Sequence, residues 1–194
     1  MANERASTMD VSSLWAQVAV ITFVVGFGIL GYLAFSIYHR QPPVPLEVVS
    51  EDGQVLFGRD DIMRGQHLFQ KYGLMQFGTL FGHGAYLGPD FTAQYLDRAV
   101  RSMQRLYAGD GAAPEVAARI ERELKANRYE EGSGRLVFTA GQAEAFSAAR
   151  SFYRDWFGPP DRQQGLRRPT ITDEGHLHAI AAYFAWASWV TTEA

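Results

Sequence analysis

The chain has 194 residues, a formal net charge of −3 and no cysteine. This length suits one domain of ordinary size together with a membrane anchor. No run of Lys or Arg supplies the basic patch that nucleic-acid binding requires, so we expect no nucleic-acid partner. The absence of cysteine excludes disulfides, thiolate zinc sites, thiol nucleophiles and covalently attached c-type haem.

An uncharged apolar segment, residues 14–38, follows a polar tail of residues 1–13. At ~1.5 Å per residue it would be roughly 37 Å long, which exceeds the ~30 Å hydrocarbon core of a bilayer. The alternative is a cleaved signal peptide, whose apolar region usually has about 7–15 residues. This segment is longer and continues into His39-Arg40-Gln41-Pro42-Pro43. We therefore predict an uncleaved transmembrane helix, whose orientation the few flanking charges do not set.

A folded domain is expected over residues 60–171, after an extended linker over residues 39–59 in which residues 47–57 turn at Gly53. Apolar residues that recur at i+3 and i+4, together with capping residues, predict four helices in this domain. They begin near Asp60, at Asp90, after Pro114 and at a capping box formed by Thr139 and Gln142. The predicted fold class is all-α and membrane-anchored.

The last segment, residues 172–194, starts with Thr172-Asp173-Glu174 and becomes apolar and aromatic. It is too short to cross a membrane by itself, because about 20 residues are needed. Two interpretations remain open at this point: a buried terminal helix, or the start of a second transmembrane helix.

Candidate catalytic residues are few. His176 and His178 are spaced i, i+2 and point to different helix faces, and no HExxH motif or carboxylate–histidine cluster accompanies any histidine. Glu121 and Glu123 are expected on a solvated helix face. Nucleophile-elbow and phosphate-loop motifs are also missing, so we predict no catalytic residue in this chain.

The most distinctive segment is GQHLFQKYGLMQFGT at residues 65–79, followed by GHGAYLGPD at residues 82–90. The glycines around Tyr86 indicate a bent backbone whose carbonyl groups face outward. Such an arrangement suits a hard cation or a partner surface.

The whole chain resembles the N-terminal portion of the quinol-dependent nitric oxide reductases, and GHGAYLGPDFTA at residues 82–93 is similar to a signature of that family. Those enzymes resemble a fusion of a membrane-anchored cytochrome c subunit with a many-helix catalytic unit of the haem-copper-oxidase type. The resemblance implies that residues 172–194 start a second transmembrane helix. It also implies that haem b, haem b3 and non-haem iron belong to a catalytic portion absent from this chain.

The cytochrome subunit attaches haem through a C-x-x-C-H-T motif. On this sequence the two cysteines fall at Leu74 and Phe77, the ligating histidine at Gly78 and the threonine at Thr79. The resemblance therefore implies a cytochrome-c-like domain with no haem. We expect Leu74, Met75 and Phe77 to fill the volume of the lost haem, because an empty cavity would be costly.

Gly84 and Tyr86 match the G-A-Y motif of the cytochrome subunit. The resemblance implies that their backbone carbonyls contribute to a calcium site at the interface with the catalytic unit. No other metal or cofactor is expected in this chain.

The function that the resemblance implies is that of an anchor and lid domain in a quinol-oxidising nitric oxide reductase of the denitrifying respiratory chain. Catalysis, the reduction of nitric oxide to nitrous oxide and water, would occur in the catalytic unit. The implied location is the bacterial inner membrane, with the domain in the periplasm and contacts to membrane lipid. One alternative is a non-catalytic periplasmic interaction or assembly protein. Another, a cytochrome with non-covalent haem, lacks an axial ligand at Gly78.

Overall fold

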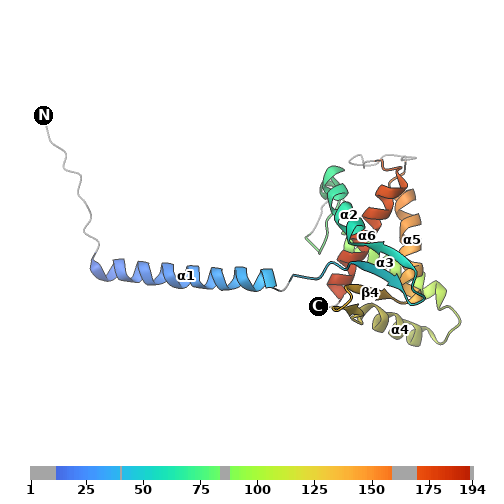
Figure 1. Ribbon diagram of the computed structural model, residues 1–194, viewed down its shortest axis with the longest axis horizontal. Coiled ribbons are helices and arrows are strands. Elements are labelled where there is room, and N and C mark those ends of the chain that lie inside the picture. The colour runs from blue at the N-terminus through green and yellow to red at the C-terminus, as the bar shows by residue number, and fades with distance from the viewer. Residues whose placement is uncertain (1–11, 40, 84–87, 159–169, 193–194) are drawn as a thin grey trace. The chain divides into compact units, whose positions relative to one another are not determined.

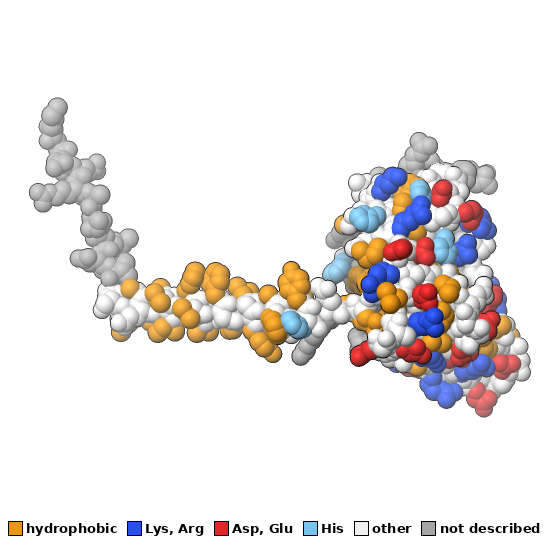
Figure 2. Space-filling model, in the orientation of Figure 1, with side chains coloured by type: hydrophobic (Ala, Val, Ile, Leu, Met, Phe, Trp, Pro, Cys, Tyr) orange, Lys and Arg blue, Asp and Glu red, His pale blue; other side chains and the backbone are white. Residues whose placement is uncertain are grey.

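The computed structural model describes residues 12–39, 41–83, 88–158 and 170–192. The chain forms two compact units, Met1–Pro43 and Val44–Ala194. The first unit contains the helix α1 (Ser13–His39), which has no buried residue (Figure 1). Within the described ranges, α1 alone has the length and hydropathy to cross a membrane. The predicted apolar helix is confirmed, and its continuous apolar surface is typical of a membrane-spanning helix (Figure 2).

The second unit is mostly helical, in agreement with the predicted fold class. Its helices are α2 (Arg59–Lys71), the 3-10 turn η1 (Leu74–Gln76), α3 (Phe91–Leu106), α4 (Ala113–Lys125), α5 (Ala140–Trp156) and α6 (Glu174–Thr192). Acidic and basic side chains are mixed over the face of this unit that Figure 2 shows.

Local capping signals explain where several of these helices begin and end. Asp90 caps α3 by accepting a hydrogen bond from the amide of Ala93 at 2.9 Å. Thr139 and Gln142 form the predicted capping box of α5, since each side chain accepts a hydrogen bond from the other residue's backbone amide. After α2, Gly73 adopts a left-handed conformation with φ of +62°.

A small sheet accompanies the helices, and the sequence predicted only part of it, a hairpin in which residues 47–57 turn at Gly53. Its strands are β1 (Glu47–Ser50), β2 (Val55–Gly58), β3 (Tyr129–Glu130) and β4 (Arg135–Phe138), in the order β2-β1-β4-β3. The predicted hairpin is present as β1 and β2, which pair antiparallel with Gly53 in the turn.

The assignment of residues 39–59 to a linker is therefore wrong for the two strands. β1 is a central strand that pairs in parallel with β4, and Val48 is fully buried. The folded unit begins near Val44 rather than at residue 60. Parallel pairing between strands so far apart in sequence leaves no local signal.

Helix α6 is the centre of the second unit. Eleven of its 19 residues are buried, and it packs against α2, α3 and α5 (Figure 1). Gly65 lets α2 approach α6 closely, because a Cβ atom at this position would lie 2.6 Å from Cβ of Tyr183 and closer still to the carbonyl oxygen of Ala179. Of the two interpretations of residues 172–194, the structure agrees with the buried helix, and a continuation of α6 into a membrane span stays a prediction.

Candidate functional site

The candidate site is the segment between α2 and α3, where the cytochrome haem-attachment motif would lie. Leu74 is fully buried, Phe77 is half-buried and Met75 is 65% exposed. The expectation that all three side chains fill a haem volume stays a prediction for Leu74 and Phe77, which are buried and half-buried, and the exposure of Met75 contradicts it. The reason is the 3-10 turn η1, whose successive side chains point about 120° apart, so that only one of three faces the core.

Gly78, at the position of the haem-ligating histidine, is buried against the start of α3. A Cβ atom there would lie 2.6 Å from the Cε2 atom of Phe91 and closer still to the carbonyl oxygen of Pro89. Any side chain at position 78 would thus point into the ring of Phe91. The glycine and the phenylalanine fit each other, and the space beside position 78 is occupied by an aromatic ring.

Phe91 is the residue of this site that the sequence analysis missed. Its ring is fully buried and stacks on Phe184 of α6, with centroids 4.6 Å apart and planes 10° apart. Phe69 of α2 and Trp156 of α5 meet the same ring edge-on, at 5.9 and 5.7 Å. Four helices therefore meet around Phe91. The stacked and edge-to-face ring contacts stabilise this junction in addition to the burial of apolar surface. The i+3/i+4 apolar pattern of the helix after Asp90 includes Phe91 and indicates a core-facing residue, but it does not reveal the contact with Gly78.

The residues at this position do not fit a c-type haem. The sequence supplies no cysteine for thioether bonds. The residue at the ligand position is a glycine, and the ring of Phe91 occupies the space beside it. A cytochrome that had merely lost its ligand would instead leave a large cavity.

The loop that leads into α3 is held by the carboxylate of Asp90. Its Oδ2 accepts hydrogen bonds from Oγ1 of Thr79 at 3.0 Å and from the amide of Gly82 at 2.8 Å. Burial raises the pKa of Asp90, but the hydrogen bonds from Ala93, Gly82 and Thr79 outweigh burial and leave the pKa below its ordinary value. Asp90 is therefore an ionised structural clamp whose two oxygens are already occupied.

The predicted calcium ligands Gly84 and Tyr86 lie outside the described residues, so that site stays a prediction. The flanking backbone is strongly bent, since Gly82 has φ of +75°. A Cβ atom at Gly88 would overlap the carbonyl group of Phe77. Among the described residues, no group of three or more His, Asp or Glu side chains is placed to hold a metal ion.

The two histidines of α6 lie against opposite ends of α2. His176 Nδ1 is 2.9 Å from the hydroxyl of Tyr72, and His178 Nε2 is 3.7 Å from Oδ2 of Asp61. Both have local partners and do not converge on one site.

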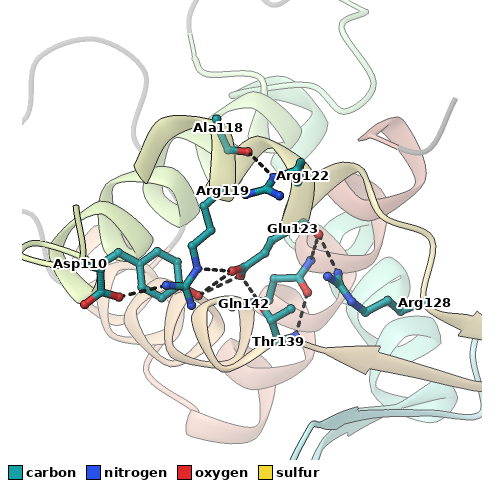
Figure 3. Close-up of polar contacts among 9 residues, drawn as sticks. Asp110, Ala118, Arg119, Arg122, Glu123, Arg128, Thr139 and Gln142 are labelled. Carbon is teal, nitrogen blue, oxygen red and sulfur yellow. Dashed lines mark hydrogen bonds and ion pairs between the residues drawn. The ribbon is translucent and has the colours of Figure 1, made fainter. Parts of the chain in front are cut away.

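A second polar cluster surrounds Glu123 of α4 (Figure 3). Its side chain is only 12% exposed, so the expectation that Glu123 lies on a solvated helix face is wrong. The carboxylate accepts hydrogen bonds from Oγ1 of Thr139 at 2.7 Å, the hydroxyl of Tyr107 at 2.9 Å and Nε of Arg119 at 2.9 Å. These donors come from three different segments, a relationship that sequence spacing does not reveal.

These features define a class of protein: a mostly helical domain with a small sheet and no cysteine, preceded in the chain by a helix able to span a membrane. The model of one family, the NorB cytochrome c-like domain of nitric oxide reductase, matches residues 45–194, and the chain belongs to this family. The matched region includes α6, in agreement with its place in the core. A comparison with curated proteins gave no match.

Proposed function

We propose that the chain is the haem-free anchor and lid domain of a quinol-oxidising nitric oxide reductase. In this proposal α1 holds the domain at the bacterial inner membrane, and the folded unit covers the catalytic unit from the periplasmic side. The catalytic unit, outside this chain, reduces two molecules of nitric oxide with two electrons and two protons to nitrous oxide and water. The family match supports the association with nitric oxide reductase.

The observation that carries the proposal is the contact between Gly78 and Phe91. A domain of this family whose axial-ligand position is a glycine packed on an aromatic ring is unsuited to relay electrons through a c-type haem. Electrons must then reach the catalytic unit by another route. A membrane quinol is the donor that fits, because it delivers electrons within the bilayer and needs no haem in this domain.

The surface that we assign to the catalytic unit is the docking loop, defined as residues 75–81. Met75 and Phe81 are 65% and 40% exposed, and Phe81 is held with a positive φ of 59° by a hydrogen bond from its amide to Oγ1 of Thr92. Exposed apolar side chains on a fixed backbone are typical of protein interaction sites.

Co-purification tests this assignment. The affinity-tagged full chain is expressed with the nitric oxide reductase catalytic unit of the same organism, and the catalytic haems that are retained are quantified. We expect Met75→Glu to reduce retention by about tenfold, equivalent to ~1.4 kcal/mol of binding free energy. Leu106→Glu, a matched change at an exposed leucine of α3, should retain the catalytic unit.

The outcomes separate two errors. If the unsubstituted chain retains no catalytic unit, the proposed function is wrong. If it does and Met75→Glu behaves like Leu106→Glu, the chain is a subunit of the reductase and the docking loop is misassigned.

A further inference from the structure

Helix α4 differs from the other helices of the second unit in how little of it is buried. Ile120 is the one buried residue among its 13, whereas α3 and α5, to which it is joined, each bury six. Apolar packing therefore contributes less to holding α4 in place than it does for its neighbours.

Apolar grooves follow the side of α4 that faces α3. One groove, of about 360 Å³, lies between Leu96 and Val100 of α3 and Ile120 and Leu124 of α4. A second, of about 290 Å³, continues past Ala117 toward the start of the helix. The apolar side of α4 is therefore only partly packed against the core. A tightly packed helix would leave no grooves of this size.

Polar contacts fix α4 on its other side, and they centre on Glu123 (Figure 3). Besides the three donors to its carboxylate, its backbone carbonyl accepts hydrogen bonds from Nη1 of Arg128 at 2.9 Å and Nε2 of Gln142 at 3.3 Å. One residue therefore ties α4 to the end of α3 and to the start of α5.

Charged and titratable groups surround this carboxylate from every neighbouring segment. Arg119 lies on α4 itself, with its guanidinium 3.6 Å from the ring centroid of Tyr107, and it also pairs with Asp110 at 3.0 Å. Arg128 approaches from the strand side. The carboxylate therefore faces one cation, Arg119, and the phenol of Tyr107, with Asp110 more distant, while Arg128 contacts the backbone carbonyl of Glu123.

The backbone before α4 can act as a hinge. Gly109 has φ of +107°, and a side chain at Gly109 would meet nothing within 4 Å. Gly111 follows two residues later and precedes the N-cap Ala112, and a Cβ atom on Gly111 would lie 2.7 Å from the side-chain carboxylate of Glu115. A glycine in open space, such as Gly109, imposes little resistance to rotation of the chain around it.

We propose that α4 is a flap, latched by Glu123, that opens as a unit about residues 109–111 while α2, α3, α5 and α6 stay folded. Opening separates Ile120 and Leu124 from Leu96 and Val100 and exposes the apolar grooves. The latch consists of the hydrogen bonds that the Glu123 carboxylate accepts from Tyr107 and Thr139, the two donors that lie outside α4.

The latch stays closed at neutral pH. Burial raises the pKa of Glu123, but hydrogen bonds from Thr139, Arg119 and Tyr107 outweigh burial and hold the pKa below its ordinary value. The carboxylate is therefore ionised and fully hydrogen-bonded around pH 7, and flap opening is a rare event of the folded state.

Hydrogen exchange of the full chain in detergent, followed by mass spectrometry, tests the latch. Glu123→Ala should speed exchange in residues 116–125 by at least ~10-fold and leave residues 177–189 of α6 within about twofold of the unsubstituted chain. Glu121→Ala is the matched control, since Glu121 lies on the same helix and its ion pair with Lys125 is exposed. Hydrogen exchange in residues 116–125 should be unchanged in the Glu121→Ala variant.

Thiol labelling gives an independent readout, because the chain has no cysteine of its own. Ile120→Cys reports the buried side of α4, and Ala181→Cys reports the buried centre of α6. With iodoacetamide we expect Ile120→Cys to react at least ~10-fold faster than Ala181→Cys, and adding Glu123→Ala should widen this ratio.

Two results would overturn the proposal. Equal labelling rates at the two positions would mean that α4 opens only with the whole unit. Equal acceleration of α4 and α6 by Glu123→Ala would mean that Glu123 stabilises the unit in general and is not a latch.

Discussion

Gly78 and Phe91 occupy adjoining space so closely that a Cβ atom on the glycine would lie 2.6 Å from the phenylalanine ring. The residues at positions 78 and 91 therefore depend on each other. A side chain cannot be accommodated at position 78 while Phe91 keeps its place.

The first prediction follows from this contact. The purified chain should show no Soret band, and Gly78→His should not gain one on addition of hemin, because Phe91 blocks the imidazole. Gly78→His should also destabilise the domain by about 1–3 kcal/mol, the usual cost of overpacking. Absorbance spectroscopy and urea unfolding of the full chain in detergent measure the two effects. A near-stoichiometric Soret band in the unsubstituted chain would contradict the haem-free core.

Phe91 should contribute more to the free energy of unfolding than the side chains of the docking loop do. Phe91→Ala should cost ~3–5 kcal/mol, because four helices pack on its ring, while half-buried Phe77→Ala should cost about 1–2 kcal/mol. Met75→Ala, an exposed position, is the control and should stay within ~0.5 kcal/mol. Urea unfolding ranks the three variants, and a loss at Phe77 equal to that at Phe91 would show that Phe77 also fills the core.

Close approach of α2 and α6 should make Gly65 intolerant of any side chain. Gly65→Ala places a methyl group against the backbone of Ala179 and should cost about 1–3 kcal/mol or more. Gly132→Ala is a suitable control, because a Cβ atom there meets nothing within 4 Å. A shift of the denaturant midpoint for Gly65→Ala no larger than that for Gly132→Ala would contradict the observed helix crossing.

His178 should make the domain less stable in mild acid. Burial lowers the pKa of His178, and the opposing effect of the Asp61 carboxylate does not cancel it. The unfolded chain, with a histidine pKa of about 6.5, then binds the proton more readily than the folded chain, so stability falls as the pH drops below ~6.5. Thermal unfolding between pH 7 and pH 5 should show a decrease of Tm that His178→Gln reduces. His67→Gln, the same change at an exposed histidine, is the matched control.

Calcium should bind weakly or not at all to this chain alone. Two neutral carbonyls, at Gly84 and Tyr86, make a poor site for a hard dication. The nearby carboxylate of Asp90 is already occupied by three hydrogen-bond donors. Isothermal titration calorimetry measures the affinity. Tight binding would mean that carboxylates of this chain complete the site, so that the predicted interface location would be wrong.

Features set by neighbouring residues were predictable from the sequence. The caps Asp90 and Thr139 act within one helical turn, and both were located correctly. The replacement of a haem ligand at Gly78 stays a prediction, which rests on the resemblance of residues 74–79 to a haem-attachment motif.

Features set by distant partners were not predictable. Strand β1 pairs with β4, which places Glu47 beside Arg135. Because these two strands lie far apart in the sequence, residues 47–58 looked like a linker. Glu123 looked solvated because its partners Tyr107 and Thr139 lie 16 residues away on either side. Similarly, composition alone could not distinguish a buried helix from a membrane helix at residues 172–194, because both environments exclude charge.

The central position of α6 also sets the order of events during synthesis. α1 ends at His39, but the core is complete only when α6, which starts at Glu174, is available to pack. At roughly 5–20 residues per second, about ten seconds of translation separate the two. The membrane helix thus leaves the ribosome well before the domain can fold, so insertion into the bilayer comes first and the domain folds on whichever side insertion has delivered it.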